Sequence, residues 1–418
     1  MGRVKEMMLE MEEHGDWPVG LEDKYVCASH FDDVYLRKKI YAIGERGVCS
    51  YCGKKRQVAN MQEFGEFISV KVHDHYDNVH DAALLSADSF YDNEDEEIPG
   101  FKEFCGYVVP DEAECYDSTS DLLYDLGFDV DNDDLREDVE DIFSTQEWVS
   151  RDILSTERKD VWMSKLWEKF SSMVKYQRRF TFLAEPAFLG SIKKTKEKYP
   201  VEDTNILSVL SFLINKTKLK TFLNSSKVFY RARKVDKIES EYGFDDITSP
   251  PDSSAFQNRM SPAGISMFYA SFDKETAQEE AAGDDPVGIL IGTFRPRRNL
   301  HVVDLTAIPK KLSYWMDHYQ ENIFLKRFNE EVTKPVDPDD KDIEYIPTQV
   351  FTEYLRYMFK DSAGKPIDGI IFGSSRETKN KNLVLFCDQK DSKQYVELTA
   401  PVEVYSKKWV KFRDDKTL

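Results

Sequence analysis

The stretch that decides the fold of this chain runs from Arg259 to Glu280 and reads RMSPAGISMFYASFDKETAQEE. It opens with a Ser-Pro-x-Gly turn and continues as a short, mostly apolar strand over residues 265–270. A helix is expected to begin near Asp273 and to carry Glu280 in its second turn. Because strand ends and helix starts often border ligand sites, this order predicts that Arg259, Tyr269 and Glu280 meet at one cleft.

Five further stretches accompany this one in a fixed order. They are Val228–Arg233 (VFYRAR), Leu300–Thr306 (LHVVDLT), Tyr345–Gln349 (YIPTQ), Ile367–Arg376 (IDGIIFGSSR) and Asn382–Phe386 (NLVLF). The set resembles the RES family, which is named for its Arg, Glu and Ser residues. The resemblance covers residues 225 to 405.

The resemblance implies a small α+β fold similar to ADP-ribosyltransferases. It also implies consumption of NAD+ by phosphorolysis or hydrolysis of the nicotinamide–ribose bond, as in toxins that deplete cellular NAD+. Arg231 and Arg259 match the two arginines of the family, Glu280 matches its Glu and Ser374 its Ser. We therefore expect Glu280, Ser374 and Arg231 to be catalytic, and Arg231, Arg259 and Tyr269 to bind NAD+.

The chemistry of these residue types is compatible with that substrate. Arginine forks hold phosphate oxygens bidentately, so Arg231 and Arg259 suit a pyrophosphate. Tyr269 can stack on a flat ring and still form a hydrogen bond through its hydroxyl. Cleavage of the glycosidic bond places positive charge on the ribose, which the carboxylate of Glu280 would stabilise. Ser374 is assigned to substrate positioning, because no matched motif supplies a base that would activate it as a nucleophile.

For two of these assignments, a nearby residue of the same type is an alternative. Glu280 competes with Glu275 and Glu279, and is preferred because it lies eleven residues after Tyr269, as in the family. Ser374 competes with Ser375, and is preferred because Arg376 follows two residues later. The sequence departs from the family at Phe372-Gly373, where a bulky residue and Pro are usual. Arg233, Arg376 and Asn382 remain unassigned candidates for the pocket.

A second motif lies near the N-terminus. It has the form C-x2-H followed by C-x2-C, and its members are Cys27, His30, Cys49 and Cys52. Thiolate and imidazole ligands in two short knuckles suit a tetrahedral zinc ion, and four protein ligands leave no open position for catalysis. Structural Zn2+ is therefore predicted here.

Composition limits the remaining function classes. With 418 residues the chain can form two or three domains. The formal charge of −20 argues against general nucleic-acid binding and against anionic membranes. No apolar run reaches the length of a membrane span, and the first residues lack the apolar core of a signal peptide. Six cysteines in so long a chain do not indicate a disulfide framework. A cytoplasmic protein is expected.

The chain is predicted to contain three parts: residues 1–60 with a helix and the zinc knuckle, residues 61–224 with helices, and residues 225–418 with the RES-like domain. Helices are predicted at about residues 160–176 and 203–223 from their apolar stripes. The helical part resembles the HEPN-like segment that precedes some RES domains. It lacks the R-x4–6-H ribonuclease signature, since no His occurs between His80 and His301. A regulatory domain is therefore expected.

The predicted fold class is α+β, with a mostly helical N-terminal domain followed by a mixed α+β RES domain. The predicted function is degradation of NAD+ by a glycohydrolase or phosphorylase activity. The enzyme is expected to be a toxin or antiviral effector that its N-terminal domain restrains. The alternatives are a protein ADP-ribosyltransferase and a non-catalytic, zinc-bearing binding module. NAD+ and an antitoxin or trigger protein are the expected partners, and homo-oligomerisation is left open.

Overall fold

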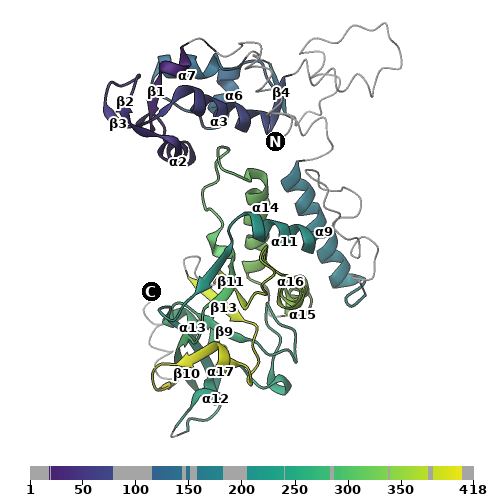
Figure 1. Cartoon of the computed structure of the whole chain (residues 1–418). Coiled ribbons are helices and arrows are strands. Elements are labelled where there is room, and N and C mark those ends of the chain that lie inside the picture. Colours follow the sequence, from purple (N-terminus) through teal and green to yellow (C-terminus); the bar gives the residue numbers. More distant parts are fainter. Residues whose placement is uncertain are drawn as a thin grey trace, which may run out of the picture. The chain divides into compact units, whose positions relative to one another are not determined.

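The computed structural model describes residues 18, 20–78, 115–143, 147–150, 158–181, 205–239, 241–282, 287–337, 339–374 and 380–406 (Figure 1). The chain divides into two compact units. The first consists of Met1–Lys159 and Lys311–Gln320, and the second of Asp160–Lys310 and Glu321–Leu418. Both units contain helices and strands, so the predicted α+β class is confirmed. The helix predicted within residues 1–60 at the N-terminus lies outside the described residues.

The N-terminal unit combines helices with two small sheets, of strand order β1-β3-β2 and β4-β6-β5. Its elements are η1 (Leu21–Asp23), β1 (Tyr25–Cys27), η2 (Ala28–His30), α2 (Val34–Ile43), β2 (Glu45–Val48), β3 (Lys55–Asn60), α3 (Met61–His73), β4 (Tyr76–Asn78), β5 (Cys115–Tyr116), α6 (Thr119–Asp125), α7 (Asp133–Glu140) and β6 (Trp148–Ser150). Asp33 and Asn60 cap α2 and α3 by accepting backbone N–H bonds. This unit was expected to be mostly helical, and the structure shows that it also contains short strands.

A short segment from the second half of the sequence completes the core of this unit. Trp315, in residues 311–320, is buried among the apolar side chains of α3, α6 and α7. Its ring lies 6.0 Å from that of Phe128. The ammonium group of Lys71 donates to the carbonyl of Met316 at 3.2 Å and to Asp317 Oδ1 at 2.8 Å. The fold of the N-terminal unit therefore depends on residues far away in the sequence.

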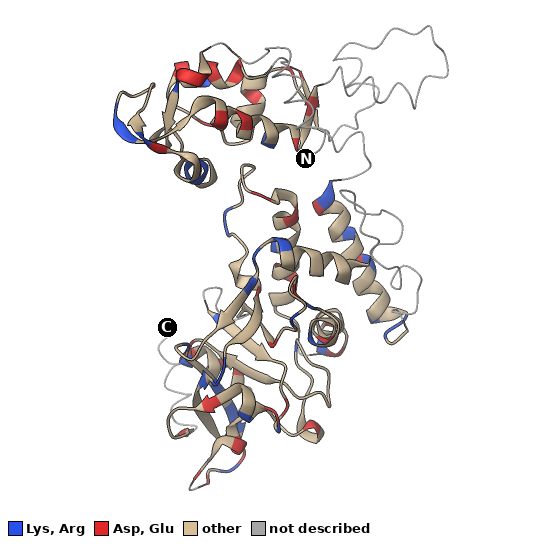
Figure 2. Ribbon diagram, viewed as in Figure 1, with Lys and Arg blue, Asp and Glu red and all other residues tan. Residues whose placement is uncertain are grey.

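Charge is unevenly distributed over the N-terminal unit (Figure 2). Cations gather on α2 and on the β2–β3 hairpin, and carboxylates gather on α7. The exposed cations are Arg37, Lys38, Arg46, Lys54, Lys55 and Arg56. The overall charge of −20 therefore does not describe every surface of the molecule.

The second unit is built on a large mixed sheet of order β14-β10-β8-β9-β13-β12-β11-β7, with β15 paired to β10. Its strands are β7 (Lys220–Leu223), β8 (Phe229–Val235), β9 (Phe268–Ser271), β10 (Gly288–Pro296), β11 (Leu300–Asp304), β12 (Gly369–Gly373), β13 (Lys381–Leu385), β14 (Val396–Leu398) and β15 (Glu403–Ser406). The β11–β12 pair is parallel, and the other recorded pairs are antiparallel.

Long helices pack on this sheet and share one apolar core. The helices and turns of the unit are α9 (Lys159–Tyr176), α11 (Ile206–Lys216), α12 (Phe244–Ile247), η4 (Asp252–Ser254), α13 (Lys274–Ala282), η5 (Leu305–Ala307), α14 (Tyr319–Thr333), α15 (Lys341–Glu344), α16 (Ile346–Tyr357) and α17 (Ser392–Tyr395). Side chains of α9 and α11 are buried in the same cluster as those of α14, α16 and β11. This compact unit therefore begins at Asp160, well before the domain boundary predicted near residue 224.

The helix predicted over residues 203–223 is shorter than expected, because it ends at Lys216. Asn205 caps its start, and the chain turns at Lys218, whose φ is +58°. Residues 220–223 then form β7, an edge strand that pairs antiparallel with β11. The apolar residues near 219–223 therefore belong to a strand and its turn, since tertiary pairing overrides the helical pattern there.

Residues 259–280 form a turn, a strand and a helix in the predicted order, although the strand begins three residues later than predicted. The strand is β9 (Phe268–Ser271), and the helix is α13 (Lys274–Ala282). Asp273 caps the helix, since its Oδ1 accepts from Thr276 N at 2.8 Å. Among the described helices, none is both long and apolar enough to cross a membrane.

Candidate functional site

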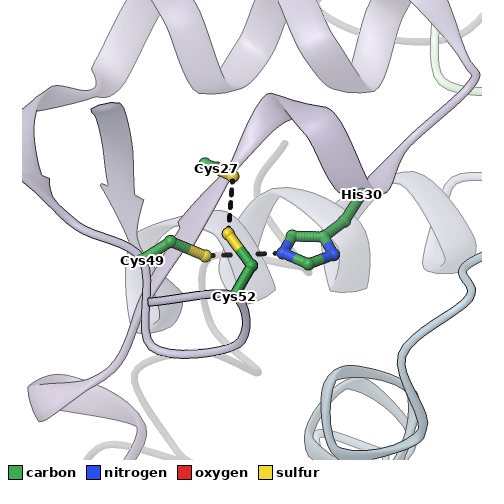
Figure 3. Close-up of side chains that lie close together, drawn as sticks. All are labelled: Cys27, His30, Cys49 and Cys52. Atoms are coloured by element: carbon green, nitrogen blue, oxygen red, sulfur yellow. Dashed lines mark hydrogen bonds between the residues drawn. The ribbon is translucent and has the colours of Figure 1, made fainter. Parts of the chain in front are cut away.

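Four metal-ligand side chains of the N-terminal unit converge as the sequence predicted (Figure 3). The ligand atoms of Cys27, His30, Cys49 and Cys52 all lie within 4.8 Å of one another. The Cys27 and Cys52 sulfurs are 3.8 Å apart, and Cys49 Sγ is 3.5 Å from His30 Nε2. Two thiolates at ~2.3 Å from a tetrahedral zinc ion would be ~3.8 Å apart. The residues therefore fit a tetrahedral metal ion.

Backbone hydrogen bonds help to hold the two knuckles in place. Gly53 N donates to Cys49 O at 2.9 Å, and Ser50 N donates to Tyr25 O at 2.8 Å. Gly53 has a φ of +66°, which glycine adopts without strain and which closes the turn after Cys52. The first knuckle follows β1 directly, so the β-pairing of β1 with β3 brings both knuckles to one place.

Two further contacts prepare the ligands for a cation. Burial acts to raise the pKa of the Cys27 thiol, but hydrogen bonds with Ser29 outweigh it, and the pKa lies below its ordinary value. The second ring nitrogen of His30, Nδ1, lies 3.8 Å from Asp131 Oδ1. A carboxylate on that side is the usual outer partner of a metal-bound histidine.

The second unit has a cavity of about 230 Å³ where β8 and β9 meet. The recorded pairing of these two strands is Tyr230 with Ser271, and residues of both strands line the cavity beside this pair. Its lining consists of Tyr230, Arg231, Ala232, Pro250, Ala255, Phe256, Asn258, Ser261, Ile265, Met267, Tyr269, Ala270, Ser271, Ala277, Glu280, Ala281 and Asn382. Three of the five predicted site residues, Arg231, Tyr269 and Glu280, are therefore brought to one cavity.

Glu280 on α13 is held by two hydrogen-bond donors at the same carboxylate oxygen. Asn382 Nδ2 donates to Glu280 Oε1 at 2.6 Å, and Ser374 Oγ donates to it at 3.2 Å. Asn382 and Ser374 are both buried, whereas Glu280 is exposed at the cavity. Because both donors meet at Oε1, they orient the carboxylate, and among the described residues none is recorded as bonding to Oε2.

Arg231 on β8 is fixed in the wall of the cavity. Its Nη1 donates to the carbonyl of Tyr269 at 2.7 Å, its Nε donates to the carbonyl of Thr248 at 3.2 Å, and its guanidinium lies 5.3 Å from the centroid of the Phe268 ring. Burial, helped by the charge of Arg233, lowers the pKa of Arg231 to about 10. It therefore remains a cation at neutral pH, although two of its nitrogens already serve backbone carbonyls.

Tyr269 and Arg259 occupy different places at the site. The hydroxyl of Tyr269 is 3.1 Å from Ser261 Oγ, and burial raises its pKa, so the phenol stays neutral. Arg259 does not line the cavity. Its Nη2 donates to the carbonyl of Lys334 at 2.6 Å, and its guanidinium lies 4.9 Å from the centroid of the Tyr345 ring. Burial lowers the pKa of Arg259, and the charge of Glu280 is among the groups that oppose this shift.

Ser374 follows β12 and donates to Glu280, but it is not among the residues that line the cavity. Its backbone N–H donates to the carbonyl of Asn380 at 2.9 Å, and its side chain borders a second, more open hollow with Thr333 and Lys334. Of the unassigned candidates, Arg233 donates to the carbonyl of Asp246 at 2.8 Å, and Arg376 lies outside the described residues.

Asn382 was named from the sequence only as an unassigned candidate for the pocket, and in the structure it lines the cavity and donates to Glu280. It opens the NLVLF stretch on β13, where it pairs with Ser271 of β9 and Phe372 of β12. A polar residue at the start of an otherwise apolar, buried strand is a signal that could have been weighted more strongly. Its contact with Glu280 depends on the position of β13 between β9 and β12, which the sequence alone does not show.

Comparison with protein-family models gives two matches along the chain. HEPN/RES N-terminal domain 1 matches residues 42–187, and the RES domain matches residues 228–405. No curated protein matches the chain. The RES match connects the chain with an NAD-related function at the level of the family. The chain therefore contains a RES domain, preceded by a HEPN/RES N-terminal domain.

Proposed function

We propose that this chain is an enzyme that degrades NAD+ by cleaving the bond between nicotinamide and ribose. The observation that carries the proposal is the carboxylate of Glu280, held at Oε1 by Asn382 and Ser374 at a cavity lined by Arg231 and Tyr269. The assignment of these residues to NAD+ rests on their match to the family motifs together with this geometry.

The main task of the protein in this reaction is to stabilise the positive charge that develops in the transition state. The C1′–N bond breaks with its electron pair moving to the pyridinium nitrogen, so nicotinamide leaves as a neutral molecule. The ribose then carries oxocarbenium charge, and an oriented carboxylate stabilises that charge more than it stabilises the ground state. A water oxygen that bonds to C1′ gives ADP-ribose and releases a proton; a phosphate oxygen gives ADP-ribose 1″-phosphate.

The other residues have supporting roles in this scheme. Glu280 faces the ribose through Oε2, and Asn382 and Ser374 keep it there. Arg231 places fixed positive charge in the wall, and we assign its Nη2, which has no recorded acceptor among the described residues, to a phosphate oxygen. Arg259 is a phosphate-binding residue only if it exchanges its bond to the Lys334 carbonyl for one to the substrate. Tyr269 provides a neutral aromatic surface.

The test is NAD+ turnover by the purified full chain, with and without inorganic phosphate, beside Glu280→Gln. We expect the substitution to lower turnover by roughly 10²- to 10³-fold, the usual effect of removing one transition-state electrostatic group. Glu275→Gln is the matched control, because Glu275 lies on the same helix and outside the cavity lining.

The products distinguish the alternatives. Free ADP-ribose indicates hydrolysis, the 1″-phosphate indicates phosphorolysis, and label on protein from labelled NAD+ indicates ADP-ribosyl transfer. If neither the wild type nor Glu280→Gln binds or consumes NAD+, the proposal is wrong and a non-catalytic binding module is favoured.

We propose in addition that Cys27, His30, Cys49 and Cys52 hold a structural zinc ion. The donor set of three thiolates and one imidazole, at tetrahedral spacing, supports zinc over the harder oxygen-seeking cations. Four protein ligands close the coordination shell, so the metal would stabilise the fold and not take part in catalysis.

The toxin role and its restraint are further parts of the proposal. A domain that destroys NAD+ must be controlled, and the N-terminal unit is the part of this chain available for that task. Expression of the full chain in bacteria, with the NAD+ pool measured over time, tests whether the enzyme is held inactive until a trigger or loss of an antitoxin releases it.

A further inference from the structure

Phe256 is a large apolar side chain that the proposed chemistry leaves unused. It is 83% exposed, yet it lines the cavity that contains Arg231, Tyr269 and Glu280. Isolated exposed apolar residues are common on proteins and need no function. An aromatic ring at the rim of a ligand cavity is different, because a bound ligand would cover the apolar surface that water now contacts.

The loop that carries Phe256 is held in place by hydrogen bonds. Gly264 N donates to the carbonyl of Ala255 at 2.9 Å, and Asn258 Nδ2 donates to the carbonyl of Phe256 itself at 2.9 Å. Gln349 Nε2, from α16, donates to the carbonyl of Asn258 at 2.8 Å. The backbone on both sides of the ring is thus fixed before a ligand binds, so little ordering entropy is lost on binding.

The size of the cavity indicates which part of the substrate reaches this ring. Pockets that enclose a drug-sized ligand have volumes of ~300–1,000 Å³, whereas this cavity measures about 230 Å³. NAD+ has two flat rings, two riboses and a pyrophosphate. Because Glu280 must lie beside the ribose that is cleaved, the nicotinamide end occupies the cavity and the adenosine end extends over its rim.

We propose that Phe256 is the stacking surface for the adenine ring of the dinucleotide. This inference rests on the proposed function and extends it from the cleaved bond to the recognition of the distal half of the substrate. Stacking suits the site because a flat aromatic ring binds a base through its face and needs no hydrogen-bond donor. Phe256 is accordingly a binding residue that determines specificity, and not a catalytic residue.

The test compares a whole and a truncated substrate. NAD+ and nicotinamide mononucleotide share the bond that breaks, but only NAD+ has an adenine. In the full chain, Phe256→Ala should raise KM for NAD+ by roughly 5- to 100-fold, the range for loss of one aromatic–base stack, with kcat nearly unchanged. KM for nicotinamide mononucleotide should stay within twofold, and Phe256→Trp should restore the KM for NAD+.

Phe180→Ala is the matched control, since that ring is 88% exposed and does not line the cavity. It should change neither KM. Equal effects of Phe256→Ala on both substrates, or no effect on NAD+, would overturn the inference.

A binding measurement separates this inference from the proposed function. Calorimetric titration with ADP-ribose and with ribose 5-phosphate requires no turnover. If Phe256→Ala weakens only ADP-ribose binding, the adenine contact is supported even when the protein does not consume NAD+. If NAD+ is consumed but Phe256→Ala binds ADP-ribose as tightly as the wild type, the adenine contact is wrong and the proposed function survives.

Discussion

The Cys/His cluster and the candidate active site are assembled in opposite ways. The four cluster ligands lie between Cys27 and Cys52, in two knuckles that short-range hydrogen bonds shape. The active-site groups lie between Arg231 and Asn382, and β8, β9, α13, β12 and β13 each supply or adjoin one of them. The four ligands of the cluster would close the shell of a tetrahedral ion, whereas Oε2 of Glu280 has no recorded hydrogen bond among the described residues and is proposed to face the substrate. A stabilising site can be local and complete, but a reactive site must stay open.

The largest expected effect comes from breaking the closed cluster. Cys49→Ser removes one of four ligands and should abolish bound zinc and unfold or loosen the N-terminal unit. Structural zinc binding contributes ~10–16 kcal/mol in small peptides, and less is expected here because this unit has its own apolar core. Metal analysis and calorimetric unfolding measure both effects, with Cys115→Ser as control. An unchanged zinc content and unfolding temperature would show that the cluster is not a metal site.

The next prediction concerns residues 311–320, which are distant in sequence from the rest of the N-terminal unit but belong to it. Trp315→Ala should destabilise that unit by about 3–5 kcal/mol, because a buried Trp is replaced by a cavity. Trp315→Phe should cost less, since the buried Nε1 of Trp315 has no recorded hydrogen-bond partner among the described residues. Hydrogen exchange of α3 and α11, measured separately, checks this. Loss of protection in α11 alone would contradict the assignment of residues 311–320 to the N-terminal unit.

A smaller effect concerns the donors that orient Glu280. Asn382→Ala should lower kcat about 10-fold, because one hydrogen bond to a charged group is lost. Asn382→Asp has the same shape but replaces the donor with a carboxylate beside Glu280, so kcat should fall about 100-fold.

The order of these two variants is informative in itself. If Asn382 only filled space, the isosteric Asp would be tolerated better than Ala. Asn205→Asp is the control, because Asp caps a helix as well as Asn and Asn205 is the cap of α11.

The smallest expected effect concerns the helix that carries Glu280. Lys274 of α13 pairs with Glu403 of β15 at 2.7 Å, and Tyr405 also donates to Glu403. The hydrogen bond from Lys274, followed by that from Tyr405, lowers the pKa of Glu403 below its ordinary 4.5. Both charged side chains are partly exposed, so Glu403→Gln should reduce stability by only about 0.2–1 kcal/mol at neutral pH.

The pH dependence of this pair has a definite sign. A carboxyl group with a lowered pKa in the folded state stabilises it above the unfolded pKa, and this contribution is lost as the pH falls. Urea unfolding of wild type and Glu403→Gln should therefore differ at pH 7, and the difference should be lost as the pH falls below the ordinary pKa of 4.5. A difference that grows at low pH would contradict the ion pair.

Much of the organisation could be predicted from the sequence. The α+β class, the C-x2-H and C-x2-C ligands and the strand–helix order of residues 259–280 follow from local patterns, and the structure has them. Of Arg259, Tyr269 and Glu280, which were predicted to meet at one cleft, Tyr269 and Glu280 line one cavity together with Arg231, whereas Arg259 does not line it. The end of the helix at Lys216 was not predictable, since the apolar residues of β7 continue the helical stripe.

The sequence by itself determined the elements whose reason is local: the knuckles, the capped helices and the residue types that suit NAD+. Only the tertiary structure decided which distant groups touch. It placed Asn382 and Ser374 on one oxygen of Glu280, it kept Arg259 out of the cavity lining, and it placed residues 311–320 in the core of the N-terminal unit. The physical reason is that contacts between sheet neighbours depend on strand order and register, which arise from the packing of the whole unit and are not encoded within any one segment.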